Sequence, residues 1–185
     1  MAALIMAVLV FVSSLGFATD LYDVMSKAVD YPGTEWQYEK VPGATVYYDT
    51  FEFNSAYTGV SIVLLIITLL LFITNTHSRR KYYIGNYIAT GLVAAAQIAS
   101  AVWCVPQILS YKSQYQNEVD FEALKAFSKD WGTLYKGPDE TFWFDLCCVI
   151  FILLIITSLL LAANVFFKIT VMKAEREAIG RGKGE

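Results

Sequence analysis

Long uncharged apolar blocks constrain this chain more than any other feature of its sequence. Three of them cover Tyr57–Asn75, Tyr82–Gln107 and Phe142–Phe167, and none contains a lysine, an arginine or a glutamate. A helix needs about 20 apolar residues to cross the hydrocarbon core of a bilayer. Only 17% of the 185 residues are charged, against about 25% in a typical soluble domain, so we expect the chain to lie in a membrane.

A fourth apolar block, Ala2–Ala18, allows two interpretations. Gly16 and Ala18 resemble the small residues of a signal-peptide cleavage site, but the block has no basic residue at its start. We therefore expect a retained transmembrane helix. The predicted fold is an all-α bundle of four transmembrane helices in a single membrane domain, 1–185, with spans at about 2–18, 57–75, 82–107 and 142–167.

Two loops on one side of this bundle carry further patterns, and they cover residues 19–56 and 110–141. In the first loop, two runs rich in aromatic and β-branched residues, 35–41 and 45–53, flank Pro42-Gly43. Such runs around a turn predict a small β-hairpin. In the second loop, apolar residues at helical spacing from Val119 to Trp131 predict a short amphipathic helix.

The charged residues orient the bundle. The turn between the second and third spans contains Arg79, Arg80 and Lys81, and the tail 168–185 is also rich in lysine and arginine, whereas most acidic residues fall in the two loops. Basic residues favour the cytoplasmic side of a membrane protein. This pattern places the N- and C-termini in the cytoplasm, or in the matrix of a mitochondrion, with the basic turn near lipid headgroups.

Few residues at membrane depth can carry chemistry. Gln97 lies deep in the third span, and Asp145 lies at the start of the fourth; we interpret them as an interhelical hydrogen-bonding group and a helix N-terminal charge. The three cysteines, with the single histidine His77, show no spacing typical of a metal site. We expect no catalytic residue, metal or cofactor, and therefore no enzyme.

The third span carries a pattern of small residues. Gly91, Ala95 and Ala99 recur at four-residue spacing, which lets the backbone of another helix approach closely. We predict that this ridge is a helix-packing interface, with a helix of this chain or of a partner.

Four spans, a first loop with strand character and Trp36, a short basic turn and a second loop together resemble the claudin/PMP22-type tetraspan proteins, which include Sur7-like relatives in fungi. The resemblance is one of topology and covers nearly the whole chain. Thr34-Glu35 precede Trp36 where that family has Gly-Leu, and the first loop has no cysteine, so no functional residue is transferred. The resemblance implies a protein that organises other membrane proteins.

The sequence leaves three functions open. The leading hypothesis is a non-catalytic accessory or structural subunit of a larger membrane assembly, because buried chemistry is sparse and a helix-packing ridge is present. The alternatives are a homo-oligomeric channel or transport subunit and a supernumerary subunit of a respiratory or other membrane enzyme complex. The expected partners are the lipid bilayer and other membrane subunits or copies of the chain itself, and not nucleic acid.

Overall fold

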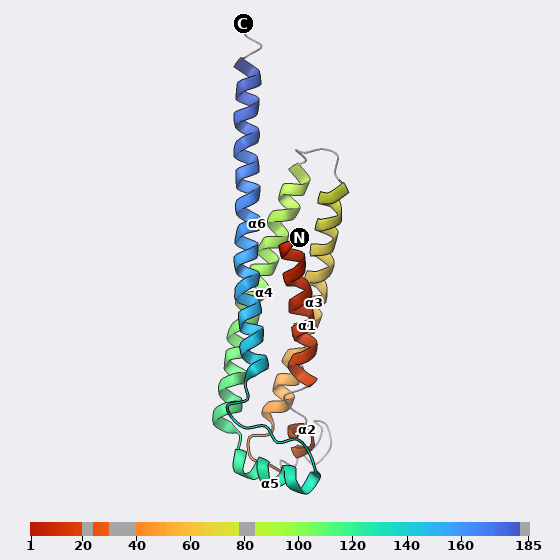
Figure 1. The fold of residues 1–185 in the computed structure, drawn as a ribbon, viewed down its shortest axis with the longest axis vertical. Coiled ribbons are helices and arrows are strands. Elements are labelled where there is room, and N and C mark those ends of the chain that lie inside the picture. Colours follow the sequence, from red (N-terminus) through yellow and green to blue (C-terminus); the bar gives the residue numbers. More distant parts are fainter. Residues whose placement is uncertain (20–23, 30–39, 78–83, 182–185) are drawn as a thin grey trace.

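The computed structural model describes residues 1–19, 24–29, 40–77 and 84–181, and the chain within these ranges is helical. Figure 1 shows long helices running side by side, with two short helices at one end, which we call the loop end. In chain order the helices are α1 (Ala2–Thr19), α2 (Met25–Ala28), α3 (Val46–His77), α4 (Ile84–Glu118), α5 (Phe121–Trp131) and α6 (Phe142–Arg181).

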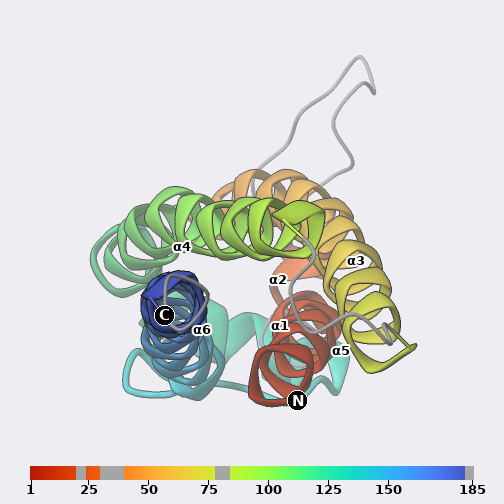
Figure 2. The ribbon, with the colours of Figure 1, turned by 90° about the horizontal axis from the view of Figure 1, so that it is seen from above.

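The four long helices form a closed ring. Each packs along two neighbours, in the order α1–α3–α4–α6–α1, and within the described ranges the backbones of the diagonal pairs α1/α4 and α3/α6 do not come within 8 Å of each other, Cα to Cα. The view along the bundle in Figure 2 shows this ring, with α4 on the opposite side from α1. The ring is not uniform in height, because α1 has 18 residues whereas α6 has 40 and extends far beyond its neighbours (Figure 1).

Each long helix buries a stripe of residues three or four positions apart. This is the spacing at which side chains of one helix fit between those of the next. The stripe of α4 consists of Thr90, Ala94, Gln97, Ala101, Cys104 and Ile108, and that of α6 of Phe144, Cys147, Phe151, Leu154 and Ser158.

Among the described residues, three helices, and not the predicted four, are long and apolar enough to cross a membrane: α3, α4 and α6, over Val46–Thr76, Ile84–Glu118 and Phe142–Ile179. The prediction of four transmembrane spans is therefore wrong. The block at Ala2–Ala18 does form a helix, α1, but its 18 residues rise by about 27 Å, less than the roughly 30 Å of a hydrocarbon core. The chain is a helical membrane protein in which a shorter helix completes the ring.

The β-hairpin predicted in the first loop is also wrong. Residues 46–53 of its second run are the first turns of α3, and most of its first run, residues 35–39, lies outside the described residues. The buried side chains explain why a helix forms here: Val46, Thr50, Phe53 and Tyr57 lie three or four positions apart, which places them on one helical face. Aromatic and β-branched residues fit that face as well as they fit a strand.

The Pro42-Gly43 turn exists, but it leads into α3 and anchors the loop end. The backbone N–H of Asp120 donates a hydrogen bond to the carbonyl oxygen of Pro42 at 3.0 Å. Gly43 has a φ of +81°, and a Cβ atom on it would overlap the carbonyl oxygen of Glu118. Glycine is therefore required at this position, both for its backbone conformation and for the close approach to α4.

The amphipathic helix predicted in the second loop is present as α5. The side chain of Asp120 caps it by accepting hydrogen bonds from the backbone of Glu122 and Ala123, and Gly132 ends it in the left-handed conformation. Leu124 on its inner face is buried and belongs to the same hydrophobic core as Phe17 and Tyr115. The core of the ring thus continues into the loop end without interruption.

Candidate functional site

Gln97 connects three helices of the ring at membrane depth. Its Nε2 donates to Thr68 Oγ1 of α3 at 3.1 Å, and its Oε1 accepts from Ser158 Oγ of α6 at 2.8 Å. Gln97 and Ser158 are fully buried, and Thr68 is 3% exposed. The amide therefore has a partner at each end, as a polar group away from water requires.

A second polar cluster lies nearer the loop end and joins α1 to α3 and α6. The hydroxyls of Ser13 and Tyr57 are 2.6 Å apart, and Tyr57 also donates to the carbonyl oxygen of Val10 at 3.2 Å. The thiol of Cys147 approaches the carbonyl oxygen of Ser13 at 3.9 Å. This cluster attaches the short helix α1 to the two helices beside it.

Aromatic rings enclose this second cluster. The ring of Tyr57 contacts those of Phe17, Phe53 and Phe151, with centroids 6.2, 6.0 and 5.4 Å away. Edge-to-face and offset contacts at these distances are favourable beyond the area they bury. Cys104 and Cys147 are buried nearby in the same core and are free thiols, as is the half-buried Cys148. The surroundings are those of a packed core.

Asp145 lies at the start of α6, near the loop end. One carboxylate oxygen accepts from Lys112 Nζ of α4 at 2.6 Å, and the other accepts from the hydroxyl of Thr141 at 3.0 Å. The side chain of Asp145 is 56% exposed, so the pair is partly solvated and contributes less than a buried pair would. Its contact to Lys112 holds the loop end of α4 to the start of α6.

The predicted packing ridge faces away from the ring. Gly91, Ala95 and Ala99 are all exposed, and a Cβ atom on Gly91 would meet no atom within 4 Å. Other small residues of α4 face its neighbours instead, because Ala94 and Ala101 are 2% and 0% exposed. The ridge therefore lies on the exposed face of α4.

Three of the predicted residues lie outside the residues that the structure describes. Arg79, Arg80 and Lys81 fall in the range 78–83, which the structure does not describe. Two of the predicted residues, Gln97 and Asp145, contact neighbouring helices. The ridge of Gly91, Ala95 and Ala99 is on the exposed face of α4 and is not part of these polar contacts. Within the described ranges, no three histidine, cysteine or acidic side chains gather closely enough to hold a metal ion.

The sequence did not reveal the partners of these polar groups. Ser13, Tyr57, Thr68 and Ser158 each lie in an apolar run where serine, threonine and tyrosine are ordinary. Their common signal is that each falls on the three- or four-residue repeat of its helix. That repeat indicates which face is buried, but it does not indicate which residues of two helices lie at the same height.

We expect replacing Gln97 by leucine, which has a similar volume, to destabilise the bundle by about 1–2 kcal/mol, since hydrogen bonds between membrane helices contribute about 0.6–2 kcal/mol. The cost stays moderate because Ser158 keeps its bond to the carbonyl oxygen of Leu154 at 2.7 Å. Unfolding of the purified protein in mixed micelles measures it. Gln97→Glu, which brings a carboxyl group beside Thr68, should destabilise the bundle more than Gln97→Leu does. Equal destabilisation by the two variants would contradict the role of the amide in joining the helices.

The fold and these clusters define a class, the helical membrane proteins whose interior is held together by side-chain hydrogen bonds between helices. No known family model, curated protein or solved structure matches the chain. The resemblance to claudin-type proteins therefore stays a prediction, and the function has to be argued from the geometry alone.

Proposed function

We propose that this chain is a non-catalytic membrane subunit that assembles laterally with other membrane proteins, through helix surfaces that its own fold leaves uncovered. The observation that carries the proposal is the outward position of the ridge of Gly91, Ala95 and Ala99. Small residues on a membrane helix allow another backbone to approach closely, and packing of this kind drives helix association in lipid.

The polar residues of the interior support a structural role. Gln97 and Tyr57 are each fully buried, and their polar atoms bond to neighbouring helices. Groups that move ions or protons across a membrane are usually ionisable and line a water-filled cavity. Here the buried polar groups are neutral and hold helices together, which favours a scaffold over a transport path.

The free length of α6 provides a second surface for assembly. Beyond Ser158, no residue of α6 whose side chain is described is buried. Tyr87 of α4 still reaches the sulfur of Met172 at 3.7 Å, and the helix stands clear of its neighbours toward its C-terminal end (Figure 1). This part of α6 exposes bulky apolar residues, among them Leu159, Leu160, Phe166, Phe167 and Val171. Such a surface suits lipid or the helices of a partner.

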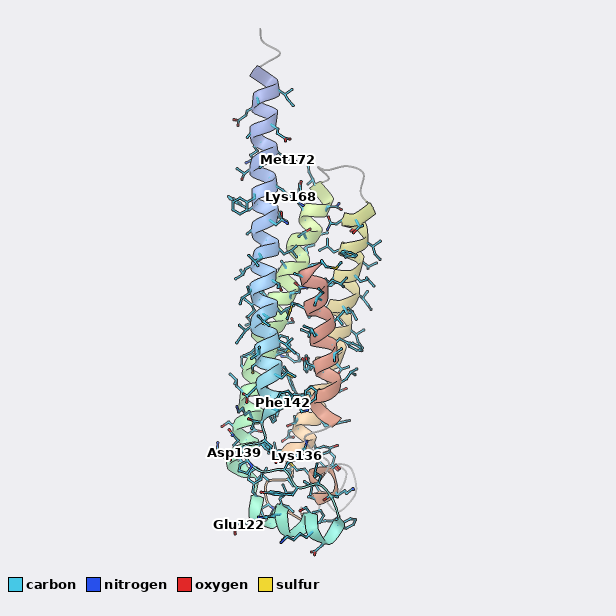
Figure 3. All side chains as sticks on the ribbon, in the orientation of Figure 1. Glu122, Lys136, Asp139, Phe142, Lys168 and Met172 are labelled. Carbon is cyan, nitrogen blue, oxygen red and sulfur yellow. The ribbon has the colours of Figure 1, made fainter. Side chains whose placement is uncertain are left out.

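The proposed orientation puts the loop end outside the cytoplasm. Figure 3 shows Lys168 toward the C-terminal end of α6, and the acidic Glu122 and Asp139 at the loop end. The basic turn at 79–81 and the basic tail then lie on the cytoplasmic side, as the excess of basic residues there predicts.

A double substitution of the ridge tests the proposal. Gly91→Leu with Ala95→Leu adds bulk where the partner helix would approach, while the free space around Gly91 leaves this chain's own fold unstrained. We expect about a tenfold loss of the assembled species, which corresponds to about 1.4 kcal/mol of contact energy. The measurement is the mass of the complex extracted from membranes in mild detergent.

A matched control adds bulk on another exposed helix face. Ile66 and Leu70 of α3 are 52% and 57% exposed and lie away from the ridge, so Ile66→Phe with Leu70→Phe should leave the complex intact. If the ridge variant kept the full mass of the native complex, or if the control lost it equally, the ridge would not be the assembly surface.

A further inference from the structure

Two hollows join to form a groove between α3 and α4, which we call the α3–α4 groove. The outer hollow, toward the loop end, has a volume of about 370 Å³, and the inner hollow about 520 Å³. Ala56 and Trp103 line both, so the two adjoin at these residues. The groove is independent of the ridge used in the proposed assembly, because neither Gly91 nor Ala95 lines it.

The inner part of the groove is apolar. Val60, Val63 and Ile67 of α3 form one wall, and Ala96 with Ser100 of α4 forms the other. The small side chains of Ala96 and Ser100 leave space in it, and a Cβ atom on Gly59 would meet nothing within 4 Å. A narrow apolar trough between two membrane helices fits a hydrocarbon chain.

The outer part of the groove has a different chemistry. Asp49 and Glu52, one turn apart on α3, line it, and neither is in an ion pair with another described residue. Three aromatic rings lie beside them: the ring centroid of Phe53 is 5.6 Å from that of Trp103 and 5.4 Å from that of Tyr111. Carboxylates and aromatic faces together attract an organic ammonium group.

Amide groups complete this outer part. Gln107 and Gln114 of α4 line it opposite the two carboxylates, and each side chain has N–H groups that can donate to phosphate oxygens. A ligand that satisfies every part of the groove needs a cationic amine and a neighbouring phosphate at the loop end, and a long apolar chain further inward.

The dimensions of the groove agree with such a ligand. From Asp49 to Ile67, the first and last residues of α3 that line the groove, the helix axis advances by about 27 Å. Half a bilayer, headgroups included, is about 21 Å thick. The groove therefore covers the depth of one leaflet, with its charged part at the level of the headgroups and its apolar part in the hydrocarbon.

We propose that the α3–α4 groove binds one zwitterionic phospholipid of the leaflet at the loop end. Its ammonium group lies between the carboxylates of Asp49 and Glu52 and the rings beside them, and one acyl chain lies along Gly59 and Val63. An anionic headgroup without an amine is disfavoured, because the two carboxylates repel it.

The test uses the full chain, purified in mild detergent, stripped of lipid and incubated with either phosphatidylcholine or phosphatidylglycerol of the same acyl chains. Native mass spectrometry then counts the bound lipid. We expect phosphatidylcholine to be retained about tenfold better than phosphatidylglycerol. Equal retention of the two lipids would mean ordinary surrounding lipid and would overturn the proposal.

Two variants locate the binding. Asp49→Asn with Glu52→Gln keeps the shape of the groove but removes its charge, and should abolish the preference for phosphatidylcholine. The charge-matched control, Glu122→Gln with Asp139→Asn, changes acidic residues at the loop end outside the groove (Figure 3) and should keep it. A preference that persists in the first variant or disappears in the control contradicts the proposal.

Gly59→Leu adds bulk to the apolar part from a position where a Cβ atom meets nothing within 4 Å, and it should lower retention of both lipids about tenfold. Helical circular dichroism verifies that the variant is folded. Unchanged retention in folded Gly59→Leu protein would show that the acyl chain lies elsewhere and would overturn the proposal. The ridge variant Gly91→Leu with Ala95→Leu should bind phosphatidylcholine normally. The lipid proposal is therefore tested independently of the proposed assembly.

Discussion

Replacing Tyr57 by alanine is expected to destabilise the bundle by about 3 kcal/mol. Truncating a buried aromatic side chain to alanine costs about 3–5 kcal/mol, through lost contacts and the cavity left behind. We take the lower end because unfolded helices that remain in lipid or detergent still shield apolar surface from water. In the native state the side chain of Tyr57 is completely buried, with an exposed fraction of 0%.

The large effect follows from the position of Tyr57 among three helices. Its ring packs against Phe17 of α1 and Phe151 of α6, and its hydroxyl reaches Ser13 and the carbonyl oxygen of Val10. Removing the side chain opens a cavity at the point where α1 is held to α3. Because α1 is the shortest helix of the ring, we expect it to detach first.

Tyr57→Phe separates the contribution of the hydroxyl to stability from that of the ring. It keeps the aromatic contacts and should cost about 1 kcal/mol, because Ser13 retains its own bond to the carbonyl oxygen of Val10 at 2.9 Å. Unfolding in mixed micelles measures all variants. Leu70→Ala, at a position 57% exposed on the same helix, is the control and should be nearly neutral. Equal losses for Tyr57→Ala and Leu70→Ala would contradict the packing described for Tyr57.

The three membrane helices were predictable because each apolar residue of a long run adds to the same preference for lipid. A run of some 20 uncharged residues has few ways to fold other than as a helix in lipid. The helix α5 was predictable for a local reason, since Asp120 and Gly132 mark its ends and Leu124 lies on its apolar face. Both kinds of signal are contained in the segment itself.

The start of α3 was mispredicted because its residue types suit two structures. Alternation of Val46, Tyr48 and other aromatic residues with polar ones indicates a strand, whereas the spacing of Val46, Thr50 and Phe53 fits a helix. The following apolar run decides the outcome, because a helix already nucleated in the membrane extends outward at little cost. A turn at Pro42-Gly43 is compatible with either structure.

The candidate sites depend on how helices face one another, which a single sequence does not contain. The ridge of Gly91, Ala95 and Ala99 was visible as a pattern, but not its outward direction. Gln97 was visible as the one amide in an apolar run, whereas its partners lie 29 and 61 residues away along the chain. The α3–α4 groove arises from two helices together and had no signal of its own.

Replacing Gly43 by alanine is expected to destabilise the loop end by about 3 kcal/mol. A residue with a Cβ atom at a positive φ costs about 1–3 kcal/mol. At φ +81° the new methyl group would also overlap the carbonyl oxygen of Glu118, which is backbone and cannot rotate away. The turn then has to move from α4, and the hydrogen bond from Asp120 to Pro42 is lost with it.

The consequence reaches beyond the turn because the loop end and the ring share one core. Val41 and Ala44, on either side of the turn, belong to the same buried cluster as Val119 and Leu124. Hydrogen exchange should therefore rise in α5 and in the first turns of α3, while the parts of α4 and α6 that hold Gln97 and Ser158 stay protected. Gly132→Ala tests the alternative that any glycine with a positive φ matters equally: its Cβ would meet nothing within 4 Å, so it should cost only about 1 kcal/mol. Equal losses at the two glycines would show that the approach of Gly43 to Glu118 contributes nothing, and that the loop end is held to the ring by other contacts.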